Sequence, residues 1–132
     1  MAPSNAEADS GSGIVALDPR FLETLRQLER QSERDLVAPL AREFLAQTPE
    51  QVATLRRALA ECDERTLADV AHSLTGNAGL LGALRLAEAS RELERLAKED
   101  GLDQGPRCLG ELESELRRVE IELLRLTDDK PS

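Results

Sequence analysis

The chemically most informative residue of the chain is its single histidine, His72, which three glycines follow within ten positions. An unperturbed imidazole titrates near pH 6.5, so near pH 7 its neutral nitrogen is a nucleophile. The sequence offers no second histidine, no Ser-His-Asp pattern and no metal-ligand cluster on which hydrolytic catalysis could rest. A single nucleophile flanked by small residues suits reversible attack on a phosphoryl group, in a relay whose partner supplies the remaining machinery.

Helical periodicity predicts that His72 points away from the core. At about 100° per residue, one arc of roughly 100° holds six apolar residues: Leu67, Val70, Ala71, Leu74, Ala78 and Leu81. His72 lies roughly 150° from the centre of that arc. The same arithmetic places Arg65, Ala68, Thr75, Gly76 and Gly79 around it on the outward face.

Two of these outward positions, Gly76 and Gly79, are glycines inside the helical pattern. A mid-helix glycine costs roughly 0.5–1 kcal/mol relative to alanine, so both make sense if a ligand or another backbone must reach this surface. Alternatively, they help to end the helix or permit tight helix packing.

Capping and proline signals predict the first helices. Asp18 is a plausible N-cap with Pro19 at the first helical position. Ser32 can cap a second helix, in which Pro39 either introduces a kink or marks the true start. Thr48-Pro49 repeats the signal and predicts a third helix that ends around Cys62.

The remaining pattern predicts the helix that carries His72, capped by Asp63, and a helix from Leu84 to about Glu99 beyond Gly82. Gly101 and Gly105-Pro106 predict the clearest loop. A last helix carries apolar residues in alternating steps of three and four: Leu109, Leu112, Leu116, Val119, Leu123 and Leu126. These five or six helices predict an all-α fold, an antiparallel four-helix bundle with an additional N-terminal helix as a lid.

Length and composition support one domain. We expect residues 14–128 to form the bundle, residues 1–13 to be a disordered leader because they are polar and small, and residues 129–132 to be a disordered tail. The formal net charge of −9 argues against nucleic-acid binding, and no stretch is apolar enough to span a membrane. We therefore expect a cytoplasmic monomer, with Cys62 and Cys108 as reduced structural thiols.

The segment from Leu67 to Glu94 resembles the histidine-containing phosphotransfer (HPt) domains of bacterial multistep phosphorelays. Their motif reads roughly Ala-His-x-Leu-Lys-Gly, followed by a small residue, a glycine and a later Leu-Glu-like pair. This chain matches it with Ala71, His72, Leu74, Gly76, Ala78, Gly82, Leu93 and Glu94. The domain at residues 14–128 is thus HPt-like.

The resemblance implies a phosphocarrier rather than an autonomous enzyme. His72 would accept a phosphoryl group from an aspartyl phosphate on a receiver domain and pass it to another receiver, in a hybrid histidine kinase or a response regulator. The family needs no cofactor of its own, and the Mg²⁺ used in transfer is held by the receiver. Gly76, one turn after His72, would let the two reacting groups meet. The chain is either free-standing or cut from a larger kinase.

The departure from the motif is Thr75, where the family usually has lysine; threonine offers a hydroxyl but no charge for the phosphoryl oxygens. Arg65 could supply charge, although a solvated surface arginine is the favoured interpretation. Glu94 either orients the imidazole or simply ends an exposed helical face. We expect the partner to dock on Ala68, Thr75, Gly76 and Gly79.

The sequence is also compatible with other kinds of helical protein. A pseudo-HPt adaptor would dock a receiver-like partner without transfer, which the missing lysine at Thr75 motivates. A generic helical bundle would leave His72 unexplained. Histidine-kinase dimerisation helices usually have an acidic residue after the histidine and then a proline, whereas Ser73 follows here; the chemotaxis-kinase phosphotransfer domain is a relative of the same fold.

Overall fold

The computed structural model describes residues 16–99 and 101–128. The predicted leader, 1–13, and the predicted tail, 129–132, lie outside the described residues. The described chain forms five α-helices and one short 3-10 helix: α1 (Pro19–Ser32), α2 (Val37–Ala60), α3 (Glu64–Leu80), α4 (Leu84–Lys98), η3 (Leu102–Gln104) and α5 (Gly105–Asp128). No strand occurs in these two ranges.

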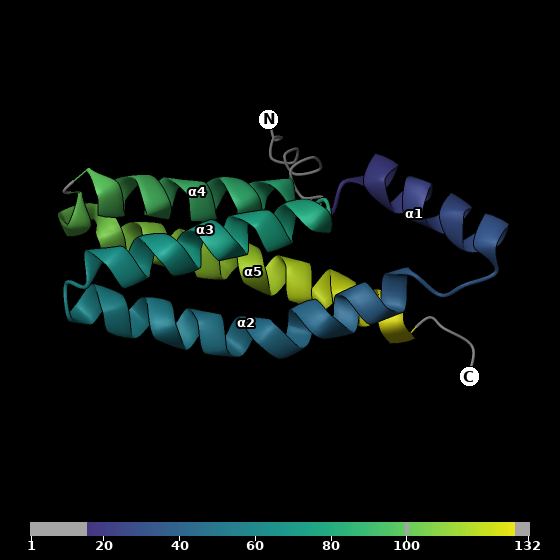
Figure 1. Cartoon of the computed structure of the whole chain (residues 1–132), viewed down its shortest axis with the longest axis horizontal. Helices are drawn as coiled ribbons and strands as arrows, with labels where there is room; N and C mark the ends of the chain where they lie inside the picture. The colour runs from purple at the N-terminus through teal and green to yellow at the C-terminus, as the bar shows by residue number, and fades with distance from the viewer. Residues whose placement is uncertain (1–15, 100, 129–132) are drawn as a thin grey trace, which may run out of the picture.

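Helices α2 to α5 form the predicted four-helix bundle (Figure 1). Helix α3 packs against α2 and α4, and α5 packs against the same two helices from the other side. The short connections after α2 and α3 make neighbouring helices antiparallel. The additional N-terminal helix, α1, lies at one end of the bundle, where it extends beyond α3 and α4 (Figure 1). The predicted fold class is therefore confirmed.

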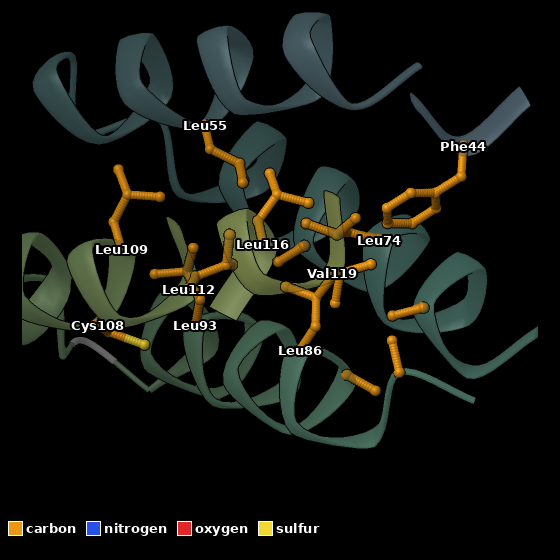
Figure 2. Close-up of a cluster of buried hydrophobic side chains, with 14 of the residues drawn as sticks. Phe44, Leu55, Leu74, Leu86, Leu93, Cys108, Leu109, Leu112, Leu116 and Val119 are labelled. Atoms are coloured by element: carbon orange, nitrogen blue, oxygen red, sulfur yellow. The ribbon is translucent and has the colours of Figure 1, made fainter. Parts of the chain in front are cut away.

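The core is almost entirely aliphatic and runs through the middle of the bundle (Figure 2). Burial of each leucine or valine side chain in this core contributes about 1.5–3 kcal/mol relative to exposure. Its largest fully buried apolar residues come from all four bundle helices: Leu55, Leu67, Leu74, Leu86, Leu93, Leu112, Val119 and Leu123. Because Leu74 and Leu93 lie in this core, the outer sides of α3 and α4 are held side by side.

Helix α2 corrects the predicted boundaries of two helices. It is continuous from Val37 to Ala60 with Pro49 inside it, so the predicted third helix at Thr48-Pro49 is wrong. Thr48 and Leu55 are fully buried and Phe44 is buried. This packing on both sides of Pro49 keeps the helix continuous although Pro49 cannot donate a backbone hydrogen bond.

The start of α2 is capped from α1 rather than by Ser32, which is the last residue of α1. The carboxylate of Glu29 accepts hydrogen bonds from the backbone N–H groups of Leu36 at 2.7 Å and Val37 at 2.8 Å. The bond from Val37 is the main reason that the pKa of Glu29 lies below its usual value. Pro39 falls in the first turn, so of the two alternatives it marks the true start.

The N-terminal helix is anchored to the turn between α3 and α4. Asp18 caps α1 as predicted, with its carboxylate accepting from Arg20 N–H, and its own N–H donates to Gly82 C=O at 2.8 Å. Gly82 has φ +71°, and a Cβ there would lie 2.9 Å from the Phe21 side chain. Helix α1 itself has no fully buried residue; the buried Ala16 and Leu17 just before it join the core instead.

The predicted loop at Gly105-Pro106 is also wrong in part. Gly101 does lie between helices, but Gly105 is the first residue of α5 and is buried beside Leu59. Proline is well tolerated in the first helical turn, where its missing N–H has no intrahelical acceptor. None of the described helices is both long enough and apolar enough to cross a membrane.

Candidate functional site

His72 lies on the exposed side of α3, as predicted. The helix begins where Asp63 accepts a hydrogen bond from Thr66 N–H at 3.2 Å, and its opposite side buries Leu67, Ala71 and Leu74. The imidazole is 75% exposed. A nucleophile in this position is open to a partner protein as well as to a small molecule.

Glu94 of α4 holds the ring in one orientation. His72 Nδ1 lies 3.2 Å from Glu94 Oε1 and 3.1 Å from Oε2, and the Glu94 side chain is only 14% exposed. Because an ionised carboxylate can only accept, Nδ1 carries a proton and donates it, and in the neutral form of the ring this leaves Nε2 with a free lone pair. Glu94 therefore does not end an exposed face, and of its two interpretations the ring-orienting one fits the contact.

Lys98, one turn further along α4, completes a row of three charged or titratable groups. Its Nζ lies 2.9 Å from Glu94 Oε2. The hydrogen bond from Lys98, and to a lesser degree that from His72, holds the pKa of Glu94 below its usual value, although partial burial opposes this shift. Sequence analysis missed Lys98, yet a glutamate four residues before a lysine is a recognised helix pair that could have drawn attention to it.

Gly76 and Gly79 lie on the exposed surface next to His72. A Cβ added at either residue would meet nothing within 4 Å, so tight helix packing does not explain them. Helix α3 continues through both to Leu80, and the turn that follows depends on Gly82 instead. The two glycines therefore leave open space on the face that carries the imidazole.

Two residues of α3 face other directions than predicted. Ala68 is only 7% exposed, so its predicted place on the docking surface is wrong. Val70 was predicted to lie on the buried arc, but it is only half-buried. Helix α3 packs between α2 and α4, and the additional cover from α4 shifts the buried arc toward Ala68. Thr75 is half-buried, and its hydroxyl donates to Ala71 C=O in the preceding turn at 2.9 Å.

The remaining charged candidate, Arg65, is exposed, and no hydrogen bond or ion pair among the described residues joins it to His72. Two large apolar side chains beyond the glycines are exposed: Leu80 at 64% and Leu84 at 58%. Within the described ranges, no group of three or more His, Cys, Asp or Glu side chains is arranged to hold a metal ion.

Comparisons with known proteins agree on one family. Residues 39–122 match the family model described as Hpt domain. The chain is 37% identical over 112 residues to the sensor histidine kinase AruS of Pseudomonas aeruginosa; the alignment covers 84% of this chain and 11% of that protein. The crystal structure of histidine-containing phosphotransfer protein B from Pseudomonas aeruginosa superposes with a TM-score of 0.78 at 26% identity, covering 89% of this chain and 98% of that one.

Proposed function

This chain belongs to the Hpt domain family of phosphorelay intermediates, and from that premise we propose that His72 is the residue on which it carries the phosphoryl group. The observation that supports the proposal is the bond from His72 Nδ1 to the Glu94 carboxylate. This bond fixes the tautomer and leaves the exposed Nε2 lone pair as the nucleophile.

The transfer follows from this arrangement. Nε2 attacks the phosphorus of an aspartyl phosphate; the N–P bond forms, the P–O bond to the aspartate breaks, and its electron pair leaves with the aspartate carboxylate. Nδ1 keeps its proton, so the ring acquires a positive charge, which the Glu94 carboxylate stabilises. Transfer to a second aspartate runs through the same steps in reverse.

The partner we propose is a receiver domain, in a hybrid histidine kinase or a response regulator, whose acidic pocket holds the Mg²⁺. In-line transfer requires the receiver to approach Nε2 closely. Gly76 and Gly79 leave room for this approach. Leu80 and Leu84, both exposed, would add apolar contact area at one end of the docking surface.

The test is transfer of label from a phosphorylated cognate receiver. We expect the chain to acquire an acid-labile, alkali-stable phosphoryl group, and His72→Gln to abolish this labelling while circular dichroism shows an unchanged helical fold. Among the described residues, the His72 side chain hydrogen-bonds with Glu94 alone and lies outside the core, so the substitution leaves the core intact. Label that persists in His72→Gln would contradict the assignment.

A second candidate function is a pseudo-HPt adaptor that docks a receiver without transfer. The observation in its favour is that Thr75 brings no charge and its hydroxyl already bonds to Ala71 C=O. Receiver binding at full affinity, with no transfer at any Mg²⁺ concentration, would distinguish the adaptor from the phosphocarrier.

A further inference from the structure

The site presents an electrostatic problem that its motif does not solve. An arriving phosphoryl group brings about two negative charges. The Glu94 carboxylate, which orients the ring, already places a negative charge 3.1 Å from Nδ1, and the whole chain has a formal net charge of −9. Thr75 contributes no charge to offset them. A cation of this chain, in addition to the Mg²⁺ that the receiver holds, would offset this negative charge while the phosphoryl group is on His72.

Lys98 has the position and the freedom to be that cation. Its Nζ and His72 Nδ1 both lie within about 3 Å of Glu94 Oε2, so Nζ is no more than about 6 Å from Nδ1, and it must turn along the ring to reach a group on Nε2. The Lys98 side chain is 63% exposed, and Glu94 is its one ion-pair partner among the described residues. It is also the single lysine in the part of the chain that the structure describes.

Arg95 and Arg65 are less suitable as this cation. Arg95, on the same helix, pairs with both Glu92 and Glu99. Arg65 makes no hydrogen bond or ion pair with His72 or Glu94 in the described ranges. Lys98 has a single ion-pair partner among the described residues and a long flexible side chain, so it can exchange that partner for a second anion within a few ångströms.

We propose that Lys98 is the cation of the phosphohistidine site: it holds Glu94 while His72 is free and turns to the phosphoryl oxygens when Nε2 is phosphorylated. This inference rests on the proposed function of His72. Lys98 of α4 would thus provide the positive charge that Thr75 of α3 lacks.

The charges of the site determine whether Lys98 favours or disfavours phosphorylation of His72. Lys98 attracts a phosphoryl group of about two negative charges and repels a ring of one positive charge, so its net effect on the phosphorylated state is favourable. At the separations and high dielectric of an exposed site, one net unit charge changes a rate or equilibrium by about three- to tenfold. Removal of the charge at residue 98 should thus slow transfer without abolishing it.

The experiment compares Lys98→Gln, Lys98→Arg and the control Arg107→Gln. Arg107 is an exposed cation that also faces a glutamate at a spacing of four, Glu111, but it lies on α5. We expect Lys98→Gln to slow transfer from a phosphorylated receiver by about three- to tenfold, with both other variants near the wild-type rate. In the Lys98→Gln background, Thr75→Lys should restore the transfer rate, whereas a cation at residue 75 would not repair a general loss of stability.

A second measurement needs neither a variant of Lys98 nor a receiver. The chain is phosphorylated chemically with phosphoramidate, and the Lys98 side-chain ¹³C–¹H signal is followed by NMR. We expect this signal to shift on phosphorylation of the wild type and to stay in place in His72→Gln. Transfer by Lys98→Gln at the wild-type rate, or a Lys98 signal that does not shift on phosphorylation, would overturn the proposal for Lys98. Either result would leave His72 as the carrier. Label that survives in His72→Gln would instead refute the proposed function and with it the role of Lys98.

Discussion

Gly76 allows the effects of side-chain size on stability and on transfer to be separated. It is an exposed residue in the interior of α3, and a Cβ there would meet nothing within 4 Å. The chain offers a matched control in Gly110, which is an exposed residue inside α5 with equally open surroundings. Substitution of each glycine changes helix propensity alike, but only Gly76 lies beside His72.

The expected stability change is the same at both positions. Replacement of a mid-helix glycine by alanine stabilises by about 0.5–1 kcal/mol, because the unfolded chain loses conformational freedom and the folded helix pays no steric penalty. For a domain of this size, that corresponds to a rise of about 2–5 °C in Tm. Gly76→Ala and Gly110→Ala should both show it by thermal denaturation.

The expected change in transfer is confined to Gly76. If the open surface admits the receiver, a Gln side chain at Gly76 occupies space that the receiver needs, and a misplacement of about 1 Å can slow a reaction by about a hundredfold. We therefore expect Gly76→Gln to transfer at least tenfold more slowly than Gly110→Gln when both are assayed with one phosphorylated receiver by rapid quench. Gly76→Ala should fall between Gly76→Gln and the wild type.

The transfer rate and the thermal stability of these variants test different properties of Gly76. A Gly76→Gln protein that transfers at the rate of Gly110→Gln would show that Gly76 does not provide access to His72. A Gly76→Ala protein that loses stability would show that the space beside the helix is not open, whatever its transfer rate.

Two further predictions concern the groups around the ring and the turn. Glu94→Gln keeps the shape of the side chain but replaces a charge-assisted hydrogen bond with a neutral one, so we expect transfer to slow by about fivefold, corresponding to about 1 kcal/mol, in rapid-quench assays; an unchanged rate would remove the carboxylate from the mechanism. Gly82→Ala should lower the free energy of unfolding by about 2–4 kcal/mol in urea titrations, because alanine is strained at φ +71° and its Cβ would lie 2.9 Å from Phe21. Gly79→Ala, with open space around it, is the control for Gly82→Ala and should not destabilise.

The sequence was a good guide to features that one helix decides by itself. Asp18 and Asp63 cap the predicted helices because each side chain meets a backbone N–H two or three residues away. His72 points outward because Leu67, Ala71 and Leu74 must be buried on the other side. Such features need only the geometry of a single helix, which the spacing of residues determines.

The predictions that were wrong concern residues whose environment depends on a second helix. Thr48-Pro49 has the local pattern of a helix start, but burial of Thr48 keeps α2 continuous through Pro49. Ala68 has the periodicity of an outward residue, but α4 contributes to the cover of that part of α3. Neither outcome is visible in the residues of one helix, because each depends on which neighbour packs against it.

The same limit explains why the site could be only half predicted. His72 and Glu94 are 22 residues apart, and they meet because α3 and α4 run antiparallel around a shared core of leucines. Within the motif, the position that usually supplies a positive charge is Thr75, which has none. Lys98 pairs with Glu94 along α4, and the packing of α4 against α3 brings this pair to His72. The chemistry of such a site belongs to the helix pair, so the absence of a residue from one helix does not imply the absence of its charge from the site.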